Sequence, residues 1–408
     1  MSPLTQTVSL NLEAEAVLDP GIRFDAPPAE NASHPKHIFL TGGTGQLGGY
    51  LLGDLLRQTT ADMHCLVRGR NPENAKARLI ENLQFCGRWQ SSFSERITPV
   101  LGDLSQERFG LDETSFRQLA GQIDVIYHSG GWVDNVRSYS LLKPVNVDGA
   151  EATIRLAALR QIKPVHFVSS LAVFFTDAHA ASEVVHETDA PRYDPNIKSG
   201  YIQSKWVADR MVQTAQSRGL PASIYRPARV TADSQTGKTN AVKDLLSLFI
   251  KSCLYLKKYP TLDISIPMVP VDYLSQAIAQ LSQREASLGK AVHFINDDPI
   301  PWCELCEIIR GLGYELEEVD YPAWRRELKR QIEQNPDKEF LKLIQALLYA
   351  PNNLFFDRPR FDMGNLRAGL AGSSVVCPPI DEKLVATYLA YFQQVGFLPP
   401  VDRVRQFA

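Results

Sequence analysis

The chain has 408 residues, a length that predicts two or three domains and allows a large core. Apolar residues make up 44% and charged residues 22%, as in soluble globular proteins, and a formal charge of −3 predicts no general affinity for nucleic acid. No run of about 18 apolar residues could span a membrane, and the first residues lack the pattern of a secretory signal. We therefore expect a cytoplasmic protein with no membrane partner.

Residues 1–35 predict a leader or linker, because prolines interrupt a stretch that has little apolar periodicity apart from a short helix at "LEAEAVL". From His37 onward, short apolar segments alternate with helical patterns. This alternation predicts an α/β fold, a Rossmann-type doubly wound parallel sheet. The predicted strands are "HIFLT", "MHCLVR", "ITPVLG", "VIYHSG", "VHFVSS" and "ASIYRP".

The alternation weakens after about residue 235. Residues 36–235 are therefore predicted to form the dinucleotide-binding domain, and residues 236–408 a smaller, mostly helical lobe that binds substrate. Helical periods occur in "DLLSLFIKSCLYLKK" and "KEFLKLIQALLYA". The segments "VPVDYLSQAIAQLS" and "AVHFIN" look like a helix and a strand, so about 265–297 is expected to return to the first domain.

The segment "TGGTGQLGG" joins the first predicted strand to the first long predicted helix. Gly42, Gly45 and Gly48 have the spacing of a dinucleotide-binding loop, in which glycines allow a tight turn and the close approach of a pyrophosphate. The N-terminus of the helix then faces the phosphates. Strand, glycine loop and helix in this order predict a dinucleotide site.

The end of the second strand distinguishes the two nicotinamide dinucleotides. Arg68 lies twenty residues after Gly48, where a carboxylate would bind the ribose 2′-hydroxyl of NAD. An arginine favours a 2′-phosphate through charge-assisted hydrogen bonds, so the predicted cofactor is NADPH. Arg78 is a candidate second contact, and Asp103 and Leu104, after the third strand, are expected beside the adenine.

A serine, a tyrosine and a lysine follow one another along the sequence in an order that predicts a proton-donating site. The strand at 165–170 ends in Ser169 and Ser170, at the sheet edge where open α/β folds bind ligands. Tyr201 and Lys205 are four residues apart, so a helix presents both on one face. The charge of the lysine is expected to lower the pKa of the tyrosine from its usual ~10.

The glycine loop, the strand-end serine and the YxxxK pair together resemble the extended short-chain dehydrogenase/reductase family. In that family the catalytic hydroxyl lies four residues before an aromatic residue, so Phe174 favours Ser170 over Ser169. The resemblance narrows to the thioester reductase domains of nonribosomal peptide synthases, polyketide synthases and carboxylic acid reductases. It covers about residues 37 to 400 and is carried by "IYHSGGWVDNV", "FVSSLAVF", "GYIQSKWVADRMV", "YRPARVTADSQTG" and "CPPIDEKLVATYLAYFQQVGFLPP".

The resemblance implies that Ser170, Tyr201 and Lys205 are the catalytic residues. Three positions depart from the family pattern: Ser170 stands where threonine is usual, Ser129 where asparagine is common and Ala228 where glycine is common. The cofactor-binding residues that the resemblance and the motifs predict are Thr41, Gly42, Gly43, Thr44, Gly45, Gln46, Leu47, Gly48, Arg68, Arg78, Asp103, Leu104, Ser129, Gly130, Gly131, Tyr201, Lys205, Arg226 and Pro227.

In function, the resemblance implies NADPH-dependent reduction of an acyl or peptidyl thioester on the phosphopantetheine arm of a carrier protein, in cis or in trans. The product would be an aldehyde, which a second hydride transfer could reduce to an alcohol. A fatty acyl-CoA reductase is the alternative with the most similar chemistry. A nucleotide-sugar epimerase or dehydratase shares the same motifs, and an NADP-sensing regulator is a non-enzymatic alternative.

Two further features carry weaker predictions. Cys303 and Cys306 have a zinc-like spacing, but no second pair completes four ligands, so we expect no metal and two buried thiols on a helix. Lys251, Lys257 and Lys258 could meet an acidic carrier protein, although such a run is more often a solvated surface.

Overall fold

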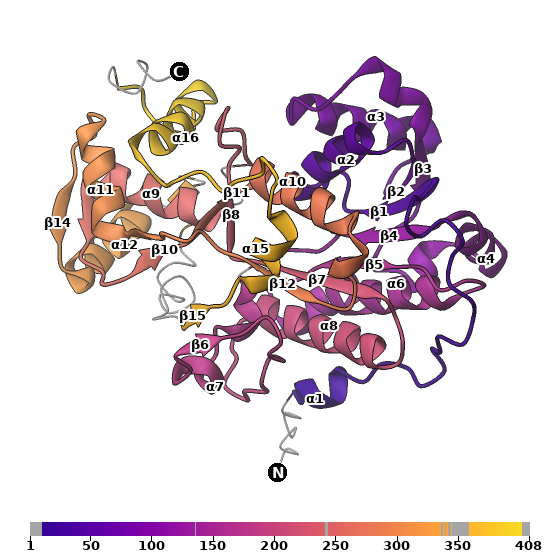
Figure 1. The fold of residues 1–408 in the computed structure, drawn as a ribbon. Coiled ribbons are helices and arrows are strands. Elements are labelled where there is room, and N and C mark those ends of the chain that lie inside the picture. Colours follow the sequence, from indigo (N-terminus) through magenta and orange to yellow (C-terminus); the bar gives the residue numbers. More distant parts are fainter. Residues whose placement is uncertain are drawn as a thin grey trace, which may run out of the picture.

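The computed structural model describes residues 10–134, 136–240, 244–335, 338, 340–341, 344 and 359–401. Its centre is a seven-stranded sheet in the order β12-β7-β5-β4-β1-β2-β3, in which every neighbouring pair is parallel (Figure 1). The predicted doubly wound Rossmann-type fold is confirmed. The strands are β1 (His37–Thr41), β2 (Asp62–Val67), β3 (Ile97–Leu101), β4 (Val125–His128), β5 (Val165–Val168), β7 (Ala222–Pro227) and β12 (Ala291–Phe294).

Helices cover both faces of this sheet, because successive strand residues point to opposite sides. Ile38 and Leu40 of β1 belong to a core with α2, α3 and α10, whereas Phe39 packs in a second core with α4, α6 and α8. The helices on the two faces are α2 (Gln46–Gln58), α3 (Pro72–Phe85), α10 (Val271–Ser282), α4 (Glu113–Gln122), α6 (Gly149–Ala158) and α8 (Gly200–Ser217).

The leader packs against the first domain. The short helix α1 (Leu12–Glu15) forms where it was expected, and Leu12, Leu18 and Ile22 are buried in the same core as α8. The Glu15 carboxylate accepts hydrogen bonds from the Tyr139 hydroxyl at 2.8 Å and from the Lys143 ammonium at 2.6 Å. The described part of the leader is therefore an ordered layer of the fold.

The second lobe lies to the left in Figure 1 and has its own core. Trp302 and Trp324 are 1% exposed and pack against Phe249, so both tryptophans belong to the core of this lobe. The lobe consists of α9 (Leu245–Leu256), α11 (Trp302–Gly311), α12 (Tyr321–Gln334), α16 (Glu382–Gln394) and the short strands β9 (Lys258–Pro260), β10 (Ser265–Ile266), β13 (Ile300–Pro301) and β14 (Glu317–Val319).

The chain returns to the first domain twice after residue 235. The first return is the expected one, in which β11 (Met268–Pro270) pairs with β8 (Arg229–Thr231) and leads into α10 and β12. The second was not predicted: β15 (Arg360–Phe361) pairs with β6 (Val184–Val185), and Leu366 joins the core that contains α10. These elements are too short to give a periodic signal. The helix predicted at "KEFLKLIQALLYA" lies mostly outside the described residues.

The two cysteines of α11 differ in burial. Cys306 is buried but Cys303 is exposed, so the expectation of two buried thiols is wrong for Cys303, which lies off the buried face of α11. Within the described part of the chain, no helix is long and apolar enough to cross a membrane. The short helices are η1 (Ser91–Arg96), η2 (Glu107–Gly110), α5 (Tyr139–Lys143), η3 (Pro144–Asp148), η4 (Leu171–Phe174), α7 (Asp177–Ala180), η5 (Glu285–Ser287) and α15 (Gly364–Leu370).

Candidate active site

The loop between β1 and α2 has a shape that two of its glycines permit. Gly42 has φ +82°, and a Cβ atom there would lie 2.7 Å from the backbone nitrogen of Gly130. A Cβ on Gly48 would lie 2.0 Å from the carbonyl oxygen of Gly42. No side chain caps the start of α2, so its first N–H groups are open to an anion. This cradle fits the pyrophosphate of a dinucleotide.

The side chain of Asn82, in α3, fixes the shape of this loop. Its Nδ2 donates hydrogen bonds to the carbonyl oxygens of Gly43 and Gly45, both at 2.9 Å. Asn82 was missed by sequence reasoning, because a polar side chain within a helix gives no sequence signal of a long-range contact. Thr44 and Leu47 lie in the same loop and first turn, where both are partly buried.

The ends of β2 and β3 bring together the residues predicted around the adenosine. The side chain of Arg68 is 73% exposed, and its Nη1 lies 3.9 Å from Oδ2 of Asp103. The guanidinium of Arg78 donates to the carbonyl oxygen of Arg68. Leu104 packs close to Gly130, since a Cβ atom on Gly130 would lie 2.4 Å from Cδ1 of Leu104. An exposed arginine at the strand end can donate hydrogen bonds to a phosphate.

The turn after β4 contains a buried hydroxyl without a hydrogen-bond partner among the described residues. It belongs to Ser129, and burying it in this way is costly unless a ligand completes it. The next residue, Gly130, donates its N–H to Thr41 Oγ1 at 3.0 Å. A Cβ on Gly131 would lie 3.4 Å from Nζ of Lys205. This turn thus joins the glycine loop to the predicted catalytic residues.

Ser170, Tyr201 and Lys205 meet at the carboxyl edge of the sheet. Ser170 caps η4, and its Oγ accepts a hydrogen bond from the N–H of Ala172 at 3.1 Å. Tyr201 is the second residue of α8, and the Ser170 side chain is near enough to lower the pKa of the Tyr201 hydroxyl. Nζ of Lys205 donates to the carbonyl oxygen of Val168 at 3.0 Å. The three side chains predicted from the motif therefore converge.

The pKa of Tyr201 is raised, whereas the sequence led us to expect that Lys205 would lower it. Burial raises the pKa of Tyr201 to about 12, and the nearby Ser170 side chain lowers it only in part. Burial also lowers the pKa of Lys205 to about 8, which the carboxylate of Asp209 partly offsets. In the protein alone, desolvation thus outweighs the attraction between phenolate and ammonium. The Tyr201 hydroxyl therefore keeps its proton at neutral pH.

Asn146 is a further polar residue at this site that sequence reasoning missed. It lies in the π-helical turn η3, and its side chain accepts from the N–H of Trp132 at 2.6 Å and donates to the Trp132 carbonyl at 3.0 Å. It also donates to the hydroxyl of Ser204, the neighbour of Lys205, at 2.9 Å. Pro144 within a helical pattern is the signal that could have indicated such a distortion.

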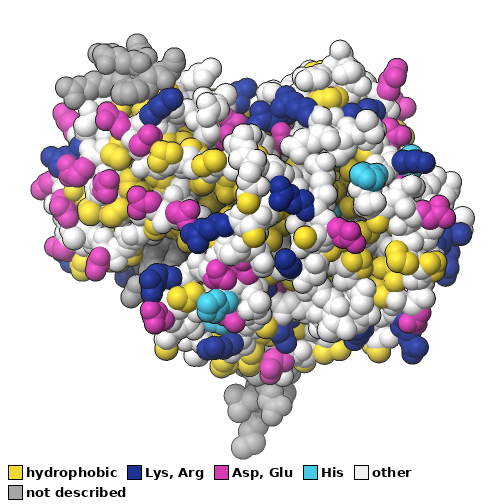
Figure 2. Space-filling view, in the orientation of Figure 1, with side chains coloured by type: hydrophobic (Ala, Val, Ile, Leu, Met, Phe, Trp, Pro, Cys, Tyr) yellow, Lys and Arg dark blue, Asp and Glu magenta, His cyan; other side chains and the backbone are white. Residues whose placement is uncertain are grey.

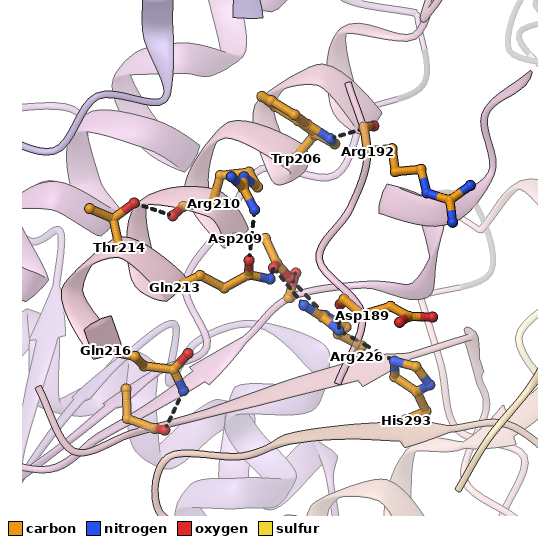
Figure 3. A network of polar contacts seen from close by, with 12 residues as sticks. Asp189, Arg192, Trp206, Asp209, Arg210, Gln213, Thr214, Gln216, Arg226 and His293 are labelled. Atoms are coloured by element: carbon orange, nitrogen blue, oxygen red, sulfur yellow. Dashed lines mark hydrogen bonds and ion pairs between the residues drawn. The ribbon is translucent and has the colours of Figure 1, made fainter. Parts of the chain in front are cut away.

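Two residues predicted to bind the cofactor have side chains that are committed elsewhere. The Arg226 side chain is 1% exposed and forms a two-pronged ion pair with Asp209, so it cannot reach a cofactor (Figure 3). The Gln46 amide donates to the Thr231 carbonyl at 3.1 Å and accepts from Thr239 at 2.9 Å. For Arg226 and Gln46, only a contact between the backbone and the cofactor remains a prediction. A cofactor contact from Pro227, at the end of β7, also remains a prediction.

The lysines considered for carrier docking do not form a free basic surface. Lys257 pairs with Glu315 at 2.5 Å and Lys258 lies 3.6 Å from Glu317. Nζ of Lys251 lies over two phenylalanine rings, with one centroid at 4.2 Å. Acidic and basic side chains are both spread over this lobe on the face seen in Figure 2. This pairing does not support the docking prediction.

Comparisons with known proteins place the chain in a family. The family model described as male sterility protein matches residues 40–278. One of the chains of linear gramicidin synthase from Brevibacillus parabrevis is 38% identical over 97% of this chain and 8% of its own length. L-2-aminoadipate reductase from Saccharomyces cerevisiae is 30% identical over 92% of this chain and 29% of its own length. The chain thus spans only a small part of these relatives.

A solved structure covers nearly the whole chain. The terminal R domain from the myxalamid PKS-NRPS biosynthetic pathway superposes with a TM-score of 0.89 at 34% identity, over 96% of this chain and 99% of that one. The resemblance to terminal reductase domains is confirmed. The chain is an NAD(P)-dependent oxidoreductase of the extended short-chain dehydrogenase/reductase type, and it belongs to the male sterility protein family.

Proposed function

We propose that this chain uses NADPH to reduce an acyl or peptidyl thioester carried on the phosphopantetheine arm of a carrier protein, and so releases an aldehyde. The convergence of Ser170, Tyr201 and Lys205 beside the glycine loop is the observation that carries the proposal. The likeness to a peptide synthase and to a terminal R domain supports a carrier-bound substrate, in cis or in trans.

In this mechanism the protein side chains bind, orient and donate a proton. When bound, the reduced nicotinamide supplies the hydride. Ser170 and Tyr201 donate hydrogen bonds to the oxygen of the thioester carbonyl as negative charge develops there, and Tyr201 gives its proton. The hemithioacetal that results expels the pantetheine thiol and leaves the aldehyde. Lys205 places a positive charge near this oxygen and near the ribose.

Replacing Arg68 by alanine should weaken the use of NADPH while leaving the use of NADH almost unchanged. An exposed arginine at the end of β2 can form charge-assisted hydrogen bonds with a 2′-phosphate, and losing them costs about 1.5–3 kcal/mol, or roughly 10- to 150-fold in the KM for NADPH. Steady-state kinetics with both cofactors measures this ratio. Arg117→Ala on α4 is the control, and an equal loss with both cofactors would contradict the role of Arg68.

Reduction should slow as the pH rises through about 8. Burial lowers the pKa of Lys205 to about 8, so its ammonium is lost above that pH, whereas Tyr201, with a pKa of about 12, keeps its proton. A plot of kcat/KM against pH reports ionisations of the free enzyme and should show this single alkaline limb. The limb should be missing in Lys205→Met, and a wild-type profile that stays flat to about pH 10 contradicts the assignment.

A substrate panel tests the proposed function itself. Acyl-pantetheine, acyl-CoA and carrier-bound thioesters are offered with NADPH, and the products are identified by mass. Aldehyde or alcohol formed fastest from the carrier-bound thioester supports the proposal. Equal turnover of free acyl-CoA points instead to a fatty acyl-CoA reductase, and no reduction of any thioester overturns both functions.

A further inference from the structure

Three side chains of α8 lie on one face of the helix. Tyr201, Lys205 and Asp209 follow one another at intervals of four residues, just over one turn. The first two belong to the catalytic group. The third is fully buried, and in Figure 3 it lies between α8 and the strands of the sheet. Asp209 therefore connects the catalytic helix to the sheet beneath it.

The carboxylate of Asp209 holds two strand ends at once. Its Oδ1 and Oδ2 accept hydrogen bonds from the fork of Arg226 in β7, at 2.8 and 3.0 Å. Its Oδ2 also accepts a hydrogen bond of 2.6 Å from the hydroxyl of Ser169, directly after β5. Gln213, one turn further along α8, donates to Oδ1 at 2.8 Å. One buried charge thus fixes α8 against β5 and β7.

The same ion pair contacts both sides of Ser170. Ser169 precedes it and is bonded to Asp209. Phe174, at the end of the short helix that Ser170 caps, lies under the Arg226 guanidinium, 4.9 Å from ring centroid to Cζ. Arg226 also donates a hydrogen bond to Nε2 of His293, whose Nδ1 is bonded to the backbone carbonyl of Asp362. The segment from residue 169 to 174 is therefore held at both ends.

We propose that Asp209 and Arg226 are positioning residues that set the distance between the Ser170 hydroxyl and the Tyr201 hydroxyl, acting through Ser169 and Phe174. Neither residue touches the substrate or the cofactor in this role. The inference rests on the proposed function of Ser170 and Tyr201 in catalysis. The buried ion pair lies outside the catalytic group but fixes the positions of its hydroxyls. Their placement within a fraction of an ångström controls the rate of the reaction.

Ser169→Ala tests this inference with a small change. It removes the hydroxyl that connects Asp209 to the neighbour of Ser170 and leaves the ion pair with Arg226 intact. Ser275→Ala is the matched control, because the Ser275 hydroxyl donates to the buried carboxylate of Asp54 at 2.5 Å, between α10 and α2. Both variants lose one hydrogen bond to a buried carboxylate, so both should show a similar fall in melting temperature.

Only Ser169→Ala should lower kcat for the best thioester of the panel, by about tenfold or more, with an unchanged Kd for NADPH. Ser169→Thr, which keeps a hydroxyl, should restore most of kcat. If Ser169→Ala keeps kcat within about twofold of the control, the inference is wrong. Tyr201→Phe is measured alongside: if it also turns over normally, the proposed function fails instead, so the two failures are distinguishable.

Discussion

Tyr201→Phe is expected to abolish most thioester reduction, with kcat lowered by about 10²- to 10⁴-fold, the usual effect of losing a positioned general acid. The substitution removes the hydroxyl that faces Ser170 and keeps the ring in its place on α8. The glycine loop and Arg68 are untouched, so the Kd for NADPH should change little. Single-turnover oxidation of NADPH and fluorescence titration of NADPH measure the two quantities.

The control for this prediction is Tyr127→Phe. The hydroxyl of Tyr127 donates to Ser282 at 2.7 Å in the core around α10, on the other face of the sheet. This variant loses a hydroxyl of the same kind and should keep its turnover. Normal turnover by Tyr201→Phe would mean that another group donates the proton, and the proposed chemistry would have to be abandoned.

The fold could be predicted from the sequence because its signal is local. A strand, a glycine turn and a helix are each visible within about 15 residues, and repetition of this unit specifies a parallel sheet. The second return of the chain was missed, since β15 has only two residues and pairs with β6 far back in the sequence. The docking of the leader was missed for a similar reason, because Glu15 meets Tyr139 only in the folded chain.

The site was predictable where a residue type is required by backbone shape. Gly42 and Gly48 could be named in advance because no other residue fits a left-handed turn or so close a contact. The pKa of Tyr201 could not be anticipated, since burial decides it and the motif does not show burial. The roles proposed for Ser170, Tyr201 and Lys205 remain predictions that their geometry supports.

Arg226 shows how a motif can name a segment without showing what its side chain contacts. The sequence "YRPAR" includes the end of a strand at the ligand-binding edge, which suggests an arginine that contacts the cofactor. Its acidic partner, Asp209, is hidden in the middle of a helix and has no motif of its own. A buried arginine needs such a partner, and the pairing removes it from the surface.

Arg226→Met should lower the free energy of unfolding by about 3–5 kcal/mol, because it leaves the carboxylate of Asp209 buried without its counter-charge. Methionine fills much of the same volume, so the loss is chiefly electrostatic. Urea unfolding followed by tryptophan fluorescence measures it. The double variant Arg226→Met with Asp209→Leu should recover part of the stability, since no charge is then buried.

Arg367→Met is the matched control for this effect. Arg367 pairs with Asp297 at 2.6 Å, but the two side chains are 65% and 71% exposed, so breaking this pair should cost only about 0–1 kcal/mol. If Arg226→Met is no more destabilising than Arg367→Met, Asp209 must find another partner or a proton when Arg226 is lost. The buried pair would then be dispensable for the fold, and its retention next to Ser170 would have to be explained by catalysis alone.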